Sequence, residues 1–429
     1  PNSPDLVQGL IPVVYDSTNE VWVKADSTNT SNSWYDYDNK EWANAVLVSS
    51  TNRSTYTSAS VGTTIADADI LAFYVWIPRY KYKVWNKNKT IGVDSYNAQT
   101  TGIDIVWESE RTSTGTISCS YNFNVDTEND GIDLSTTTAE TCTGSNGDYY
   151  THPAFTFGST NLRGFWIGKF ELSSDIADGT GSNYGGGTST SYNPLVLPNA
   201  ISWRNNPVDN FWQVIYNMQQ SNNIYGLSTS RVNTDSHMLT NMEWGAVAYL
   251  TNSNYGRCSS GSCTEVSMNN SGETSNCTSY TGRSAGLASN TAYTANGSYE
   301  YNNLTYGVLA STTGNITGVY DMSGGEWEYV MGNESSSTSN YTYYASSAGS
   351  NYTYTGNEKY VTTYAYDEEY DNQQAYNRAR LGDATGEVAV GTQYFATWDE
   401  TDPVGWYSDG AWFVDSVASW FVRGGYFDV

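Results

Sequence analysis

Short alternations of apolar and polar residues dominate the first part of the chain. Residues 10–15, 21–24 and 42–48 follow this pattern, and turns rich in Asp, Asn and Ser separate them. Such alternation is typical of half-buried strands, and these polar residues favour tight turns. Residues 1–66 are therefore predicted to form a small β-meander that packs on the rest of the chain, with an independent N-terminal domain as the alternative.

A second, larger domain is predicted over 67–429. It opens with a strand-prone segment, 71–84, that is rich in Tyr, Trp, Val and Phe. Pro78 lies inside this segment, and because proline cannot donate to a ladder of backbone hydrogen bonds, it predicts an edge position or a bulge. Polar insertions interrupt the domain near 86–148, 251–303 and 335–375.

Two segments show the spacing of a helix. Apolar residues recur at helical intervals over 206–218, where Asn206 and Pro207 supply a start signal. The other helix is predicted directly after Thr240, because Glu243 completes the capping-box pattern. Few helices among many short strands indicate an α+β fold.

A tight turn is predicted at Gly324 and Gly325. It joins the apolar run 318–322 to an alternating aromatic segment that begins at Trp327. Neighbouring glycines permit backbone angles that other residues resist, so this turn can lie close against its own strand.

Five segments, in chain order, resemble the sulfatase-modifying, formylglycine-generating-enzyme-like family, a branch of the C-type-lectin-like fold. They are Tyr-Val-Trp-Ile-Pro at 74–78, Gly-Phe-Trp-Ile-Gly-Lys-Phe-Glu-Leu at 164–172, Leu-Thr-Asn-Met-Glu-Trp-Gly-Ala-Val-Ala at 239–248, Gly-Val-Tyr-Asp-Met-Ser-Gly-Gly-Glu-Trp-Glu-Tyr-Val at 318–330 and Arg-Gly-Gly-Tyr at 423–426. Each motif is short, and their shared order makes the resemblance specific. It implies a C-type-lectin-like core of short mixed strands and about two helices, decorated by long polar insertions.

The net charge of −26, with only 19 Lys and Arg residues, disfavours binding to nucleic acid and to anionic membranes. Aromatic residues make up 15% of the chain, unlike a disordered acidic protein. This composition favours an extracellular or cell-surface protein of a bacterium. The sequence has no apolar run long enough for a membrane span and no signal peptide. Because it begins at Pro1, we expect a processed protein or a fragment.

Cysteine spacing bears on disulfides and on metal binding. The sequence has no Cys-x-x-Cys pair, and its histidines are His152 and His237, so zinc is disfavoured and both histidines are predicted to be structural. In an oxidising compartment the two N-terminal cysteines could pair, as could two of the other three, with free buried cysteines as the alternative. The five cysteines are Cys119, Cys142, Cys258, Cys263 and Cys277.

An acidic turn at 126–133 has the spacing of the first half of a calcium loop. Thr137 stands where the bidentate Glu of such a loop is expected, which favours a solvated turn over a calcium site. The acidic cluster 367–371 is likewise predicted to be a solvated face rather than a pair of glycosidase carboxyls. No cofactor is predicted, with calcium as the alternative.

The resemblance also implies where catalysis would lie. Formylglycine-generating enzymes use cysteines shortly after the strand that matches 423–426. Val429 stands about where the first of them would be, and valine supplies neither a nucleophile nor a metal ligand. The sequence therefore predicts a protein that is not an enzyme.

The segment 405–427 is dense in aromatic residues. Tyr and Trp offer stiff contact area with a polar tip, and Asp can accept hydrogen bonds from sugar hydroxyls. Phe413, Trp420 and Phe421 are assigned to the core. The segment also resembles the ligand-binding end of variable proteins diversified by retroelements, which implies exposed selectivity positions. The predicted ligand-binding residues are Trp406, Tyr407, Asp409, Ala411, Trp412, Asp415 and Tyr426.

These observations predict a non-enzymatic extracellular binding protein, an adhesin or receptor-binding module, whose ligand is a carbohydrate or protein on another cell surface. The alternative is a structural subunit of a bacterial surface filament or pilus, in which a neighbouring subunit completes a sheet by strand addition. An oxidase of the formylglycine-generating type is the third hypothesis.

Overall fold

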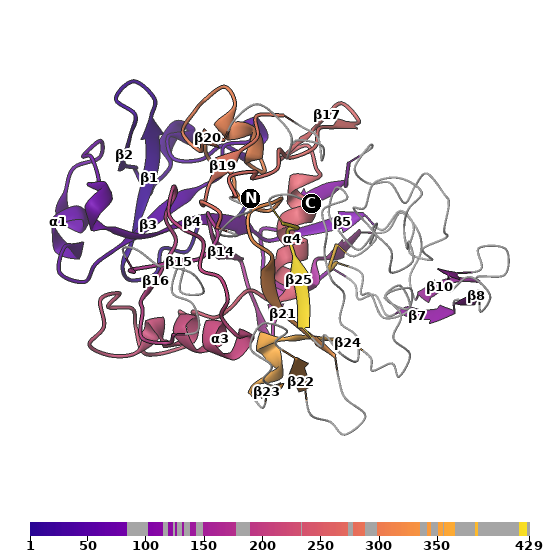
Figure 1. Cartoon of the computed structure of the whole chain (residues 1–429). Coiled ribbons are helices and arrows are strands. Elements are labelled where there is room, and N and C mark those ends of the chain that lie inside the picture. Colours follow the sequence, from indigo (N-terminus) through magenta and orange to yellow (C-terminus); the bar gives the residue numbers. More distant parts are fainter. Residues whose placement is uncertain are drawn as a thin grey trace.

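The computed structural model shows an α+β protein with few helices and several small, mostly antiparallel sheets in the part of the chain that it describes (Figure 1). The described residues are 1–83, 102–114, 149–176, 189–232, 234–272, 278–287, 298–333, 354, 356–364, 382–384 and 420–426, with the backbone alone of 119–122, 125–126, 131–132, 138–142, 334, 341–344 and 351–353.

The largest sheet is antiparallel, with the strand order β14-β4-β3-β1-β2. Three of its strands come from residues 1–66, and one of them, β3, pairs directly with β4, so the predicted domain boundary falls within one sheet. Every residue of β3 is buried, which explains its continuous run of small and apolar residues. The bounds are β1 (Leu10–Asp16), β2 (Val21–Lys24), β3 (Asn44–Val48), β4 (Ile70–Pro78) and β14 (Gly164–Gly168).

The edge position expected for Pro78 holds only locally, at the end of β4. β4 lies between β3 and β14, so it is not an edge strand, and its register with β14 runs without a shift up to Pro78. Pro78 is the last residue of β4, whereas β3 pairs with β4 only as far as Val75. Because β3 has ended before Pro78 is reached, the missing N–H costs no ladder bond there.

Smaller sheets surround this one. The segment predicted as a single strand over 71–84 is divided at Arg79, and its second half forms β5. β5 (Tyr80–Lys83) lies between β6 (Ile105–Trp107) and β11 (Tyr149–Thr151). The two-stranded pairs are β7 (Cys119–Asn122) with β10 (Thr138–Cys142), β8 (Val125–Asp126) with β9 (Gly131–Ile132), β12 (Thr156–Phe157) with β13 (Thr160–Asn161), β15 (Ser173–Ser174) with β16 (Pro194–Leu195), β17 (Cys258–Ser259) with β18 (Ser262–Cys263), β19 (Arg283–Ser284) with β20 (Tyr299–Glu300), and β22 (Tyr341–Tyr344) with β23 (Asn351–Tyr354).

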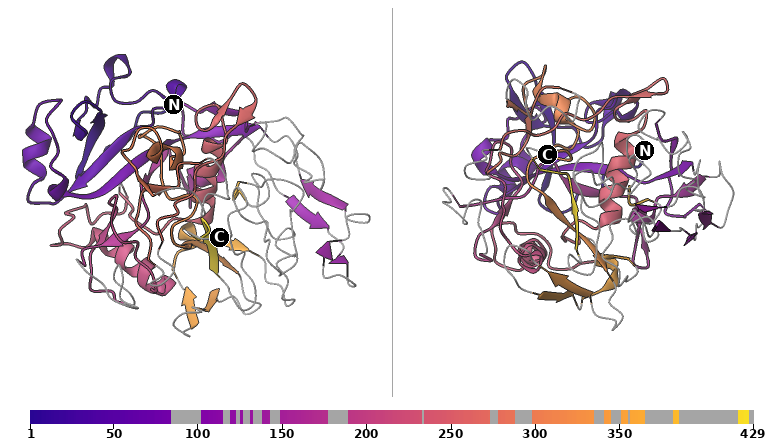
Figure 2. Two further views of the ribbon diagram at one scale, coloured as in Figure 1. Left: turned by 45° about the horizontal axis from the view of Figure 1, so that its top comes forward. Right: turned by 45° about the vertical axis from the view of Figure 1, so that its right-hand side comes forward.

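Both predicted helices are present, as α3 (Val208–Tyr216) and α4 (Asn241–Thr251), and a short helix α1 (Arg53–Ser58) precedes them. The capping box is confirmed: Glu243 N donates to Thr240 Oγ1 at 3.1 Å, and Thr240 N donates to Glu243 Oε2 at 2.9 Å. α4 lies at the centre of the molecule (Figure 2) and buries every residue except Met242. The 3-10 helices are η1 (Thr30–Asn32), η2 (Tyr37–Asn39), η3 (Asp67–Asp69), η5 (Pro153–Phe155), η7 (Asn217–Gln219), η9 (Gly307–Ala310) and η10 (Glu358–Tyr360).

A three-stranded sheet, β24-β21-β25, packs beside α4. The predicted turn precedes β21, and both glycines have positive φ angles, +75° at Gly324 and +82° at Gly325. A Cβ at Gly325 would lie 2.3 Å from Glu171 Oε1, so this close approach requires glycine. Trp420 and Phe421 are buried, as predicted, and Phe413 lies outside the described residues. The bounds are β21 (Glu328–Glu334), β24 (Thr362–Tyr364) and β25 (Trp420–Arg423).

A disulfide joins Cys258 to Cys263 across β17 and β18, which confirms that two of the three later cysteines pair. Cys119 and Cys142 are direct partners in the register of β7 and β10, and their disulfide stays a prediction. Cys277 lies outside the described residues. Within the described ranges, no helix combines the length and apolarity that a membrane crossing requires.

Candidate functional site

One sequence-predicted ligand-binding residue, Tyr426, lies in the described part of the chain. Its ring is partly buried and packs on Trp327, with 5.3 Å between the ring centroids. Trp327 is exposed, so the two rings form a small aromatic surface after β25. The other predicted binding residues, together with Thr137, the acidic cluster 367–371 and Val429, lie outside the described residues: Trp406, Tyr407, Asp409, Ala411, Trp412 and Asp415.

Among the described residues, the five-stranded sheet has one uncovered edge, which is β14. Arg79 N donates to Arg163 O at 2.8 Å, and Lys169 N donates to Phe73 O at 2.9 Å. The backbone N–H and C=O groups of odd-numbered residues in β14 therefore point toward β4. The N–H and C=O groups of Gly164, Trp166 and Gly168 therefore point away from β4. These backbone groups have no hydrogen-bond partner among the described residues.

The opposite edge of the same sheet is different, because the segment 62–65 covers β2. Lys24 N donates to Thr63 O at 2.8 Å, and Ile65 N donates to Trp22 O at 2.9 Å. Natural sheets usually protect their edges against pairing with other chains. The open edge of β14 is therefore a feature that requires an explanation.

A groove of about 1270 Å³ runs along β14. Residues 162–168 line it together with the N-terminal segment 4–8, the end of α3 and the segments that follow α3. The groove is bounded beyond β14 by a bond from Tyr320 N to Lys169 O, at 2.8 Å. Apolar side chains on its walls include Phe165, Trp166, Ile215, Met218, Leu227 and Leu239.

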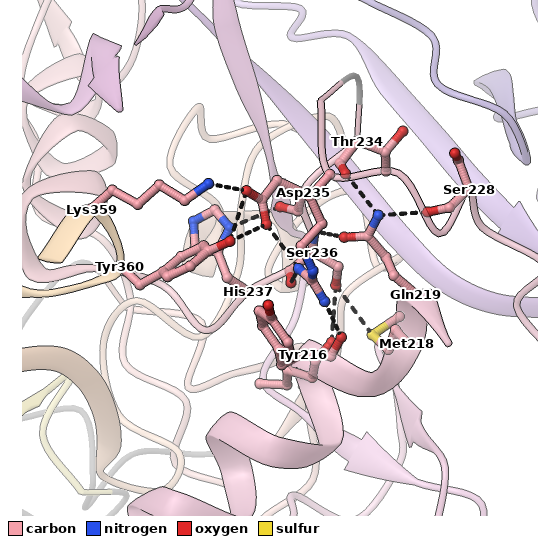
Figure 3. Close-up of polar contacts among 12 residues, drawn as sticks. Tyr216, Met218, Gln219, Ser228, Thr234, Asp235, Ser236, His237, Lys359 and Tyr360 are labelled. Carbon is pink, nitrogen blue, oxygen red and sulfur yellow. Dashed lines mark hydrogen bonds and ion pairs between the residues drawn. The ribbon is translucent and has the colours of Figure 1, made fainter. Parts of the chain in front are cut away.

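A charged cluster around Asp235 lines the groove (Figure 3). The Asp235 carboxylate accepts hydrogen bonds from Lys359 Nζ at 2.6 Å, from Tyr360 Oη at 2.9 Å and from Arg231 Nη1 at 2.8 Å. The guanidinium of Arg231 also lies over the ring of Tyr216, 3.3 Å from its centroid. These contacts tie the chain after α3 to η10.

His237 lies beside this cluster and is paired with the helix cap of α4. Its Nε2 is 3.2 Å from Glu243 Oε1, its Nδ1 is 2.8 Å from Asp235 O, and its ring stacks on Phe157. Burial alone would lower the pKa of His237, but the charge and hydrogen bond of Glu243 outweigh it, so the pKa is raised. Burial raises the pKa of Glu243, and the charge of His237 more than reverses this, so the pKa is lowered.

Replacing His237 by Gln is expected to lower the free energy of unfolding by about 1–2 kcal/mol at about pH 6, and by less at about pH 9. The raised pKa means that the contribution of His237 is present below its usual value of 6.5 and is lost as the pH rises through the folded-state value. Urea unfolding at both pH values measures the difference. An effect of equal size at the two would contradict a charged His237–Glu243 pair.

The other histidine is structural, as predicted. His152 is buried, its Nδ1 accepts a hydrogen bond from Ala154 N at 3.2 Å, and its Nε2 lies 2.8 Å from Gly382 O. Burial lowers the pKa of His152 to about 3, so the ring is neutral.

Three carboxyl groups meet at the inner end of the groove. Glu171 and Asp321 are buried, and Glu328 is partly buried. Asp321 accepts hydrogen bonds from Asn269 Nδ2 at 2.9 Å and from Gly282 N at 2.8 Å. Burial raises the pKa of Asp321 to about 6, and burial together with the charge of Asp321 raises that of Glu328 to about 8.

Glu171 accepts a hydrogen bond from Glu326 N at 2.9 Å, and burial followed by the charge of Asp321 raises its pKa well above the usual range. Glu171 and Glu328 both line the groove. Among the described side chains, no group of three or more His, Cys, Asp or Glu residues is arranged to hold a metal ion.

Neither the Asp235 cluster nor the cluster of three carboxyl groups, Glu171, Asp321 and Glu328, is evident from the sequence. Their members are far apart in the chain, for example Asp235 and Lys359, which are separated by 124 positions. The only local signal was Glu243, which was assigned a role as a helix cap alone. No protein-family model matches the chain, and no curated protein sequence matches it significantly.

Proposed function

We propose that this protein is a non-enzymatic extracellular binding protein, an adhesin or receptor-binding module, built on a C-type-lectin-like core. The observation that supports this function best is the groove along β14, with its volume of about 1270 Å³ and its apolar and charged walls. Pockets for small ligands typically have volumes of about 300–1,000 Å³. A groove of this size suits a segment of a polymer, and a protein or carbohydrate on another cell surface provides one.

The aromatic segment before β25 is the second part of the proposed contact surface. The double substitution Trp406→Ala with Tyr407→Ala is expected to abolish capture of the ligand while leaving the fold intact, because both side chains are proposed to be exposed contacts. Binding to bacterial and host cells and to a glycan array measures capture, and urea unfolding measures the fold. Val61→Ala, at a position that is 63% exposed and does not line the groove, is the control. Unfolding of the double variant would instead assign these residues to the core.

A filament subunit is the second candidate function, and the open edge of β14 is the observation that favours it. A subunit that donates a strand to its neighbour uses an uncovered sheet edge of this kind. Electron microscopy of the protein isolated from its source distinguishes the two functions. Regular fibres would support the filament, and discrete particles would support the binding module. An oxidase is the least favoured of the three candidates, because Val429 stands about where the resemblance would place the first catalytic cysteine.

A further inference from the structure

We propose that β14 receives one extended polypeptide segment of a partner protein as an additional strand, and that this segment inserts a Lys or Arg side chain beside Glu171 and Glu328. The inference rests on the proposed binding function and specifies its ligand class. It assigns backbone recognition to the sheet edge and selectivity to the inner end of the groove.

The first step is the chemistry of the open edge. Gly164, Trp166 and Gly168 each present an N–H donor and a C=O acceptor toward the groove, with no partner among the described residues. An extended peptide satisfies such groups in the same alternating pattern that pairs the neighbouring strands. Main-chain hydrogen bonds then supply affinity that does not depend on the peptide sequence.

The second step is the enclosure of the site. Besides β14, the groove is lined by Ile215, Met218 and Leu239 and by the N-terminal segment 4–8. If β14 of a second copy entered edge to edge, it would bring β4 with it, because the two strands pair along the whole of β14. A single extended segment carries no second strand into the groove, so the proposal takes one such segment as the occupant.

The third step is the chemistry of the side chains that enter. Apolar side chains line the groove beside β14, so side chains of the occupant that point into it meet apolar surface. At the inner end stand Glu171 and Glu328, and no Lys or Arg of the described chain forms an ion pair with either. A cation that arrives with the ligand lowers the raised pKa values of these carboxyl groups and stabilises their ionised form. The net charge of −26 also attracts basic segments over longer range.

The first experiment is amide hydrogen exchange on the whole protein, without added ligand. The amides of Phe165 and Ile167, which face β4, are expected to exchange slowly, whereas those of Gly164, Trp166 and Gly168 exchange rapidly. Uniformly slow exchange of all five would overturn the proposal, because the edge would already be covered within the protein itself.

The second experiment uses a phage-displayed library of random peptides, about nine residues long, to span the edge of β14. Selected peptides are expected to contain Lys or Arg and to slow exchange at Gly164, Trp166 and Gly168. N-methylation of a peptide at every second residue should weaken binding about tenfold or more, and methylation of the intervening residues about twofold or less. Equal sensitivity at all positions would overturn strand addition.

The proposed contact between the basic side chain and Glu328 is tested by changing Glu328 in the protein and Lys in the peptide. Glu328→Gln is expected to weaken the binding of a Lys-containing peptide about tenfold. The binding of the same peptide with Met in place of Lys is expected to stay unchanged. Glu110→Gln, at an exposed position, is the control for loss of one charge. Equal weakening of both peptides by Glu328→Gln would overturn the assignment of the inner end.

The failures of the two proposals are distinguishable. If no peptide is enriched but the protein still captures cells or glycans, the binding function stands and the strand-addition inference is wrong. If neither peptides nor cell surfaces are captured, both the binding function and the inference are wrong.

Discussion

Replacing Lys169 by Met is expected to lower the free energy of unfolding by about 4 kcal/mol. The Lys169 side chain is fully buried, and its Nζ donates to Asn44 Oδ1 at 2.9 Å, to Ile316 O at 2.7 Å and to Gly318 O at 2.7 Å. Methionine fills a similar volume without a donor, so three buried acceptors would lose their partner.

The position of Lys169 makes this loss global rather than local. Its three acceptors lie on β3 and on the segment before Asp321, so one amine joins the five-stranded sheet to the turn that precedes β21. Burial lowers the pKa of Lys169 well below its usual range, while the nearby rings of Trp22 and Tyr320 lie 5.4 Å and 5.3 Å from Nζ and favour the cation.

Urea unfolding of Lys169→Met against the unchanged protein measures this effect. Lys81→Met, at a partly exposed position on β5, is the matched control and is expected to cost about 0.5 kcal/mol or less. If the two substitutions have similar costs, the three acceptors find other partners and Lys169 does not act as a brace.

Replacing Glu328 by Gln is expected to raise the free energy of unfolding by about 2 kcal/mol at about pH 8.5, with little change at about pH 5. The folded-state pKa of Glu328 is raised from 4.5 to about 8, by burial first and then by the charge of Asp321. As the pH rises between these values, the unfolded chain releases a proton that the folded chain retains, so stability falls. Gln removes this titration.

The full pKa shift of Glu328 would correspond to a larger change in the free energy of unfolding. A smaller change is expected because Glu328 is only partly buried and shares its environment with Glu171 and Asp321. Urea unfolding across this pH range, with Glu110→Gln as the control, measures the slope. A Glu328→Gln protein whose stability falls with pH as steeply as the original would show that Glu328 is ionised freely. If Glu328→Gln raises the free energy of unfolding, weaker peptide binding by this variant cannot be explained by unfolding.

Local features of the fold were predictable because their causes lie within a few residues. The capping box of Thr240 and Glu243 marks the start of α4, and the glycine pair before β21 marks a turn that only glycine can make. Alternation identified the strands of residues 1–66, although it could not show which strands are neighbours.

Long-range features were not predictable from the same patterns. Pro78 indicated an edge position, but the sequence does not show that β4 is a central strand whose neighbour β3 ends before Pro78. The polar insertion near 251–303 contains Asn269, which is buried and donates to Asp321 across 52 positions, so its polarity reflects interior hydrogen bonds. The groove depends in the same way on segments that meet only in the folded chain.

The order of strands in the large sheet has a consequence for how the protein folds as it is synthesised. β1, β2, β3 and β4 are consecutive in the chain and neighbours in space, so they can pair as soon as the first 78 residues have emerged. β14 follows only at residue 164, after the long segment between them. During this interval β4 presents an unpaired edge. Other nascent chains can pair with this edge until β14 has been synthesised and covers it.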